Sequence, residues 1–136
     1  KEAIALCGLN ADDTTINSCI FAKKPGDGSA REQAASCQRF LGGGANIARE
    51  YATKRYRSNL INWGMLPLLD GETEYKKGDI VVIQGAKDSV CHGKDFDAYL
   101  VRGGKTQKID IRMDALTDVE KQIIVDGCLI NYYKKN

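Results

Sequence analysis

The residue types that could do chemistry gather in one segment, residues 26–35, which reads GDGSAREQAA. Its two glycines permit a tight turn and leave backbone N–H groups uncovered. Ser29 and Glu32 have the S-x-x-E spacing of a capping box, which predicts that a helix starts just after Ser29. A helix N-terminus with free N–H groups and a nearby arginine, Arg31, suits a carboxylate or a phosphate. The segment therefore predicts an anion-binding turn.

The elements around this turn follow from the hydrophobic pattern. Residues 3–7 are expected to be either a short strand or a remnant of a preceding segment, and the apolar run 16–22 a buried strand that leads into the turn. Small and apolar side chains from residue 30 to 41 favour a helix, which the glycines at 42–44 end. No Lys-Ser or Lys-Thr pair follows these glycines, so a P-loop is not indicated. Residues 45–49 are expected to be another short strand.

The middle of the chain carries basic and aromatic residues in alternation. A second helix is expected over roughly residues 50–62, ended by Gly64, with lysine and arginine interleaved with tyrosine. This pattern fits a solvated helix face with half-buried tyrosines, and it also fits an RNA-binding surface. The apolar segment 62–68 is expected to be a connection that passes under a sheet.

The last third of the chain reads as strands and a final helix. Residues 80–83, Ile-Val-Val-Ile, are the clearest strand. A loop with Lys87, Asp88 and His92 is expected next, and then a hairpin of residues 97–101 and 107–113 with one wet face. Thr117 and Glu120 form a second capping box, which predicts the start of the last helix.

Length and composition limit the classes of function. A chain of 136 residues with 43% hydrophobic residues and a formal charge of +2 is expected to be one globular domain. That charge does not by itself indicate nucleic acid, and no apolar run near 18 residues indicates a membrane span. Five cysteines stand far apart and are expected to be buried free thiols of a cytoplasmic protein, with no metal site in the chain: Cys7, Cys19, Cys37, Cys91 and Cys128.

Several motifs in a fixed order resemble a known family. They are the turn at 26–35, Arg-Phe-Leu-Gly-Gly at 39–43, Arg-Ser-Asn-Leu at 57–60 and Gly-Met-Leu-Pro-Leu at 64–68. Together they resemble the C-terminal swivelling domain of aconitase and isopropylmalate dehydratase, from about Ser18 to the C-terminus. Residues 59–64 are similar to a divergent branch of hydratases in that family. The resemblance implies an α/β fold: a swivelling β/β/α domain with a mixed, partly barrel-like sheet flanked by helices. It also implies that residues 1–136 are one such domain, either the C-terminal part of a longer chain or a small subunit.

The resemblance implies a function for the turn. Ser29 would be the catalytic base of a hydro-lyase, while Gly28, Ala30 and Arg31 would bind a small di- or tricarboxylate substrate. The [4Fe–4S] cluster of such an enzyme would come from partner domains or a large subunit, so this chain alone would not be active. In the family a second serine stands where this chain has Ala30, and a further substrate-binding arginine precedes the turn, where only Lys23 or Lys24 could supply a charge. The alternative is a non-catalytic carboxylate- or RNA-binding module of the same fold.

Overall fold

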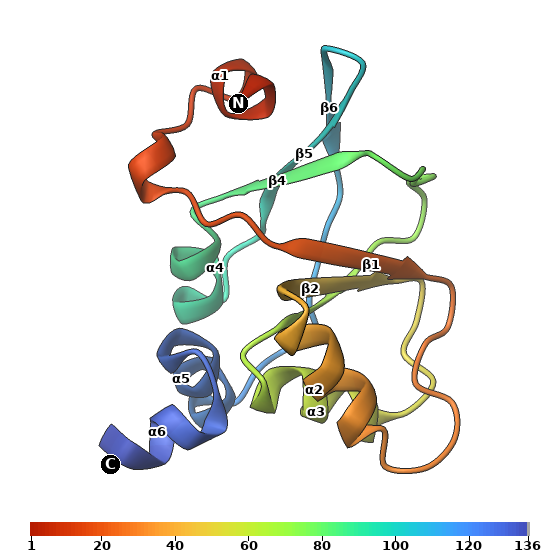
Figure 1. Cartoon of the computed structure of the whole chain (residues 1–136), viewed down its shortest axis with the longest axis vertical. Coiled ribbons are helices and arrows are strands. Elements are labelled where there is room, and N and C mark those ends of the chain that lie inside the picture. Colours follow the sequence, from red (N-terminus) through yellow and green to blue (C-terminus); the bar gives the residue numbers. More distant parts are fainter. Residues whose placement is uncertain (136) are drawn as a thin grey trace.

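Two three-stranded sheets face each other, and helices cover the outer face and one side of the arrangement (Figure 1). The computed structural model describes residues 1–135. The helices are α1 (Glu2–Leu6), α2 (Glu32–Phe40), α3 (Lys54–Asn62), α4 (Ala86–His92), α5 (Asp118–Asp126) and α6 (Leu129–Lys135), with a 3-10 turn at Ala11–Asp13. The strands are β1 (Ser18–Ala22), β2 (Gly43–Ala48), β3 (Leu66–Leu69), β4 (Ile80–Gln84), β5 (Asp97–Arg102) and β6 (Lys105–Ile109).

The first sheet is parallel and has the order β1-β2-β3. Parallel neighbours need a crossover, which α2 provides between β1 and β2 and α3 provides between β2 and β3. The expectation that residues 62–68 only connect other elements is wrong, because Leu66–Leu69 pairs with β2 as strand β3. Pro67 is compatible with this strand because β3 lies at the edge of the sheet.

The second sheet is antiparallel, with the order β4-β5-β6. The strand expected at residues 80–83 is confirmed as β4, and the expected hairpin is confirmed as β5 and β6, joined through Gly103 and Gly104. The α/β class is thus confirmed. The expected mixed, partly barrel-like sheet is not found: within residues 1–135 the two sheets stay separate, linked by one isolated bridge between Leu69 and Arg112.

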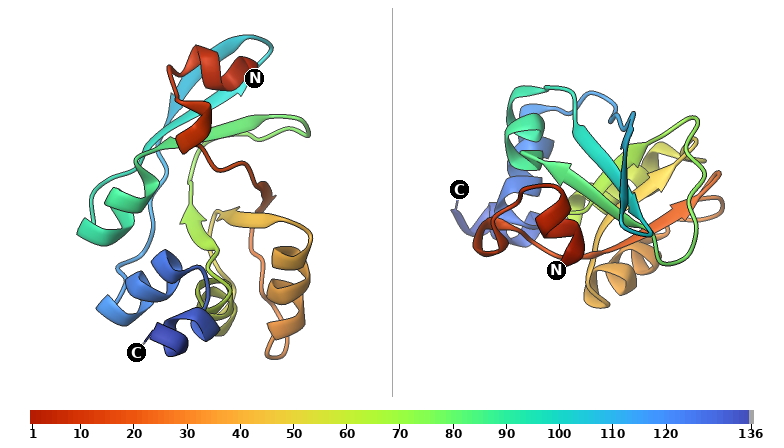
Figure 2. Two further views of the ribbon diagram at one scale, coloured as in Figure 1. Left: turned by 60° about the vertical axis from the view of Figure 1, so that its left-hand side comes forward. Right: turned by 90° about the horizontal axis from the view of Figure 1, so that it is seen from above.

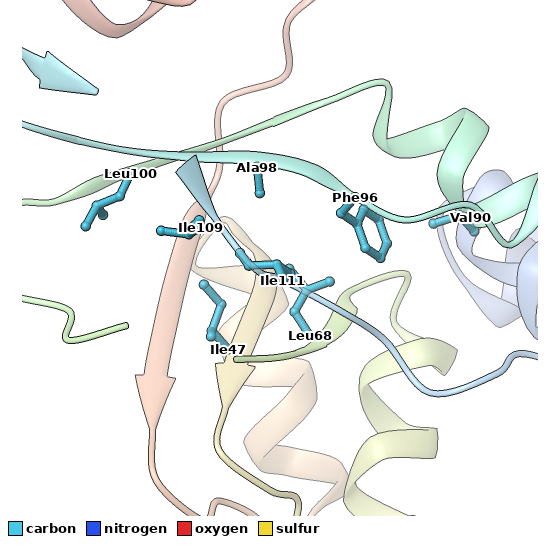
Figure 3. Close-up of a cluster of buried hydrophobic side chains, with 8 residues drawn as sticks. All are labelled: Ile47, Leu68, Val90, Phe96, Ala98, Leu100, Ile109 and Ile111. Carbon is cyan, nitrogen blue, oxygen red and sulfur yellow. The ribbon is translucent and has the colours of Figure 1, made fainter. Parts of the chain in front are cut away.

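The main core lies between the two sheets (Figure 3). Ile47 of β2 and Leu68 of β3 are each at most 1% exposed and meet side chains from the antiparallel sheet. The buried members of this cluster are Ile47, Leu68, Val90, Phe96, Ala98, Leu100, Ile109 and Ile111. Burial of so many large apolar side chains, each contributing roughly 1.5–3 kcal/mol, stabilises the parallel sheet as a platform.

Several helices differ from the expectations drawn from the sequence. Residues 2–6 form a helix and not a strand, since Ala3 is buried against Val82 and Val101. The expected loop around His92 is helix α4, which buries Ser89 and Val90. The capping box at Thr117 is confirmed, but Gly127, with φ +93°, divides the last helix into α5 and α6.

Exposure also differs from expectation at β1 and at the cysteines. β1 is an edge strand, and its first three residues are exposed, so the expected buried strand is wrong in burial although right in position. All five cysteines are free, as expected, but none is fully buried. Over residues 1–135, no helix combines the length and apolar character needed to cross a bilayer.

Candidate functional site

The turn at residues 26–31 follows β1 and precedes α2, so it starts from the carboxyl end of a parallel strand. The carboxyl ends of β2 and β3 lie at the same edge, because all three strands are parallel. In Figure 1 the loop after β1 runs from this edge of the sheet down to the start of α2. Ligands in open α/β sheets bind outside the carboxyl ends of the strands. The fold therefore places the turn where such a sheet accommodates a ligand.

Two glycines let the turn approach its neighbours closely. Gly26 has φ +95°, and an added Cβ would lie 2.5 Å from the Cβ of Tyr56 on α3. Gly28 has φ +101°, and an added Cβ would lie 2.5 Å from Nη2 of Arg31. Gly26 therefore requires glycine for backbone conformation and for space, whereas Gly28 requires it for its positive φ, and a Cβ there would only push the flexible guanidinium aside.

Arg31 has an unusual backbone. It is the only non-glycine residue with positive φ among residues 1–135, at φ +58° and ψ +20°. A side chain in this left-handed region costs about 1–2 kcal/mol. Its guanidinium folds back over Gly28, and Nε donates to the carbonyl oxygen of Asp27. The two terminal nitrogens have no hydrogen-bond partner within the described chain, so the two-pronged edge that suits a carboxylate is free.

Ser29 lies exposed at the tip of the turn. The capping box expected between Ser29 and Glu32 is not formed: the N-cap of α2 is Arg31, and no side chain caps this helix. The left-handed conformation of Arg31 delays the start of the helix, so Ser29 lies two residues before the N-cap. Its hydroxyl has no hydrogen-bond partner in residues 1–135 and stays available to a ligand. Ala30, beside it, is partly buried.

Helix α3 holds the turn from one side. The expected second helix starts at Lys54 and not at residue 50, because Thr53 is its N-cap and accepts a hydrogen bond from the N–H of Tyr56. The Thr53 hydroxyl also donates to the carbonyl oxygen of Gly26 over 3.2 Å. Asn59 donates its side-chain N–H to the carbonyl oxygen of Ala30. One face of α3 thus binds the backbone on both sides of Ser29.

A buried polar network holds α3 in place. Asn46 of β2 accepts a hydrogen bond from Gln38 of α2 and donates to the hydroxyl of Tyr56 over 2.9 Å. The hydroxyl of Tyr51 donates to the carbonyl oxygens of Asn46 and Leu68, each over 3.1 Å. Burial raises the pKa of Tyr56, so its hydroxyl stays protonated at neutral pH. The network joins both crossover helices to the sheet beneath the turn.

An ionic cluster, which the sequence reasoning missed, lies at the same edge of the sheet. Arg49, directly after β2, binds the backbone and the carboxylate of Asp70, directly after β3. The Arg49 guanidinium lies 5.1 Å from the ring centre of Phe21, and Tyr75 donates to Asp70 over 2.5 Å. Burial opposes the charged form of Asp70, but hydrogen bonds from Tyr75 and Thr73 bring its pKa below the ordinary value. The signal in the sequence that could have indicated this cluster was the position of both charged residues, each directly after a strand.

Other residues considered from the sequence have ordinary structural partners. Lys24 pairs with Glu50 at 2.7 Å, whereas Lys23 has no ion-pair partner in residues 1–135. His92 ends α4 and pairs with Asp88 of the same helix at 2.7 Å. Arg57 lies on the helix whose basic and aromatic residues also fitted an RNA-binding surface, but its side chain is only 14% exposed and binds Glu120 of α5.

Neither a metal centre nor a hollow of the molecule adds to the turn. Within residues 1–135, no three His, Cys, Asp or Glu side chains gather so that they could hold a metal ion. Hollows of about 320 to 430 Å³ lie beside α4 and α5, beside α1 and beside α6, and residues 26–31 line none of these three. The turn therefore lies outside these three hollows, on the loop from β1 to α2, which Figure 2 shows from two further sides.

Known proteins are similar to this chain in sequence and in fold. The family model described as the aconitase C-terminal domain matches residues 9–70. The methanogen homoaconitase small subunit of Methanocaldococcus jannaschii is 34% identical over 110 residues, which are 81% of this chain and 57% of that protein. The 3-isopropylmalate dehydratase small subunit 2 of Archaeoglobus fulgidus is 32% identical over 120 residues, which are 86% of this chain and 63% of that protein. The chain thus spans less than two thirds of either small subunit.

The fold also matches a solved structure. The crystal structure of 3-isopropylmalate dehydratase (leuD) from Methanocaldococcus jannaschii superposes with a TM-score of 0.67 and 30% sequence identity. The match covers 91% of this chain and 67% of that one. Aconitate hydratase A of Rickettsia bellii is 28% identical over 129 residues, but these are only 14% of its length.

Proposed function

The chain belongs to the aconitase C-terminal domain family, and on this basis we propose that it is the small-subunit part of an aconitase-like hydro-lyase. In this role its turn at 26–31 contributes the base and a carboxylate-binding arginine to an active site shared with a partner. The substrate is a small hydroxy acid with two or three carboxylates. One observation carries the proposal: the hydroxyl of Ser29 and the terminal nitrogens of Arg31 are unpaired on one exposed turn ahead of α2.

The proposed role requires that the deprotonated form of Ser29 is stabilised. A serine hydroxyl is a poor base unless its alkoxide is stabilised. The N-terminus of the nine-residue helix α2 provides partial positive charge, and the guanidinium of Arg31 provides a full one. In the reaction Ser29 takes the proton from the carbon beside a substrate carboxylate, which breaks that C–H bond and leaves the electron pair on the substrate.

Arg31 suits the recognition of the carboxylate itself. Its Nε is occupied by the Asp27 carbonyl oxygen, which fixes the direction of the planar group. The two terminal nitrogens then present parallel N–H donors, the geometry that binds a carboxylate at two oxygens. Lys23, exposed and without an ion-pair partner in residues 1–135, is the nearest unpaired cation on the segment before the turn.

The iron–sulfur cluster of this class of enzyme has no fitting site in the chain. The five cysteines lie on separate elements, and residues 1–135 hold no group of three metal-ligating side chains. The [4Fe–4S] cluster would therefore belong to the partner, a large subunit or other domains. Only binding of substrate and transfer of the proton are assigned to this chain.

Ala30 gives a second candidate function its support. It stands where the family has another substrate-binding serine, so one hydrogen bond to the substrate is absent. A turn that keeps Arg31 but lacks this contact fits a domain that binds a carboxylate without catalysing its conversion. The two functions share the carboxylate site and differ in the role of Ser29.

Titration of the isotope-labelled chain with citrate tests the shared carboxylate site. We expect the amide signals of residues 28–31 to shift, and Arg31→Gln to weaken the binding about 10- to 100-fold. Arg112→Gln is the matched control, because Arg112 is also exposed and its side chain has no ion-pair partner in residues 1–135. No shift at residues 28–31, or equal shifts in both variants, would remove the site from this turn.

A further inference from the structure

The peptide between Ala30 and Arg31 is held from outside the turn. Asn59 lies on α3, is 9% exposed, and donates its side-chain N–H to the carbonyl oxygen of Ala30. A trans peptide is planar, so its carbonyl and its N–H point in opposite directions. Because the Ala30 carbonyl faces α3, the N–H of Arg31 faces away from that helix.

The strained residue follows directly on this held peptide. Arg31 has φ +58°, a conformation that a non-glycine residue keeps only when its surroundings enforce it. Two contacts fix Arg31 from its own side: Nε binds the Asp27 carbonyl oxygen, and the guanidinium lies over Gly28. Both are exposed contacts within the turn itself. The hydrogen bond from Asn59 ties the Ala30 carbonyl, just before Arg31, to the buried face of α3.

The rest of α3 shows that this contact is part of a rigid support. Thr53 binds the Gly26 carbonyl oxygen, and the ring of Tyr56 packs on Gly26, so three residues at intervals of three along one helix face contact the turn. Tyr56 is fixed by Asn46 of the sheet. Asn59 thus connects the position of Arg31 to the parallel sheet through a helix that cannot shift freely.

We propose that Asn59 is a positioning residue: its hydrogen bond to Ala30 keeps Arg31 in the left-handed conformation and its guanidinium over Gly28, facing the substrate carboxylate. The contact with a substrate rests on the proposed function, whereas the conformation of Arg31 does not. Without the donor, the 30–31 peptide is free to rotate, and Arg31 relaxes to negative φ, which extends α2 backwards by one residue and swings the guanidinium away.

Asn59→Leu tests this, because leucine has the same branching and number of side-chain heavy atoms as asparagine and has no donor. Asn62→Leu is the matched control: Asn62 lies one turn further along α3, and its side chain makes no hydrogen bond within residues 1–135. The one-bond Cα–Hα coupling of Arg31, which separates positive from negative φ, is the direct readout in the isotope-labelled chain. Citrate titration of the same samples follows the carboxylate site.

We expect Asn59→Leu to move the Arg31 coupling toward negative φ and to weaken citrate binding about 10- to 100-fold, and Asn62→Leu to change neither. An Arg31 coupling unchanged in Asn59→Leu overturns the inference. If the coupling changes but the wild-type chain shows no response to citrate, the positioning role stands and the proposed function fails. If Asn59→Leu does not fold, Asn59→Ala takes its place, since it removes the donor and leaves room for water at the Ala30 carbonyl.

Discussion

The guanidinium of Arg31 covers Gly28 so closely that a Cβ on this glycine would lie 2.5 Å from Nη2. A side chain at position 28 would therefore displace the charged end of Arg31. The glycine and the arginine act as one unit, and substitution of either is expected to change the same function.

Gly28→Ala is expected to displace the guanidinium and to destabilise the fold by about 1–2 kcal/mol through its positive φ. Citrate binding at the turn should weaken about tenfold or more. Gly78→Ala is the control, because Gly78 has a similar φ of +94° with no atom within 4 Å of the added Cβ. Urea unfolding and citrate titration of both variants separate backbone strain from displacement of Arg31. Equal citrate binding by the two variants would show that the crowding at Gly28 does not matter.

The buried network behind the turn is expected to depend on the hydroxyl of Tyr56. Tyr56→Phe leaves the side-chain N–H of Asn46 without its acceptor in a buried site. Such a loss costs about 1–3 kcal/mol. Tyr133→Phe makes the same chemical change at a side chain that is 70% exposed, and it should stay within about 0.5 kcal/mol. Chemical denaturation measures both, and an equal stability of the two variants would contradict the role of the network.

Acid is expected to weaken the ion pair between Asp79 and Arg102. Hydrogen bonds from Arg102 and from the N–H of Lys76 lower the pKa of Asp79 from 3.8 to about 2. Because the folded-state pKa is depressed, the contribution to stability is fully present above pH 3.8 and is lost as pH falls to about 2. Asp79→Asn should thus lower the urea midpoint at pH 6 and lower it less at pH 2. Asp12→Asn, at an exposed position without an ion-pair partner in residues 1–135, is the control; a constant difference for Asp79→Asn would refute the assignment.

Arg57 is expected to stabilise the packing of α3 on α5. It binds Glu120 at 3.3 Å and the carbonyl oxygens of Asp114 and Ala115 at 3.2 Å. Arg57→Gln should destabilise the fold by about 1–3 kcal/mol, whereas Arg55→Gln, on the exposed face, should have little effect. Thermal unfolding checks this. If the two variants have equal melting temperatures, Arg57 does not stabilise the packing of α3 on α5.

Local signals predicted much of the fold. The Ile-Val-Val-Ile run at 80–83 and the capping box at Thr117 depend on residues close in sequence, and both are confirmed. Tertiary contacts decided the elements that were missed. Residues 2–6 form a helix because Ala3 packs on the antiparallel sheet, and the strand at Leu66–Leu69 was hidden by its proline, which only an edge position allows.

The position of the turn was predicted from the sequence, but its geometry was not. The sequence places Ser29 and Arg31 on a glycine turn, and they do lie there. The sequence alone does not predict the left-handed conformation of Arg31. That conformation depends on Gly28, which is close in sequence, and on Asn59, which comes from another helix. For the same reason the capping box at Ser29 was wrong: its spacing was correct, but the chain turns once more before the helix begins.

The catalytic role of Ser29 is the central claim, and Ser29→Ala in the assembly with the cluster-bearing partner tests it most directly. Because loss of a general base typically costs 10²- to 10⁴-fold, kcat for dehydration of citrate, isopropylmalate or a related hydroxy acid should fall about 10²- to 10⁴-fold with little change in KM. Ser58→Ala, which removes an exposed hydroxyl bound to the Lys54 carbonyl on α3, should retain the full rate. An unchanged kcat in Ser29→Ala would show that the base lies elsewhere and that this turn only binds.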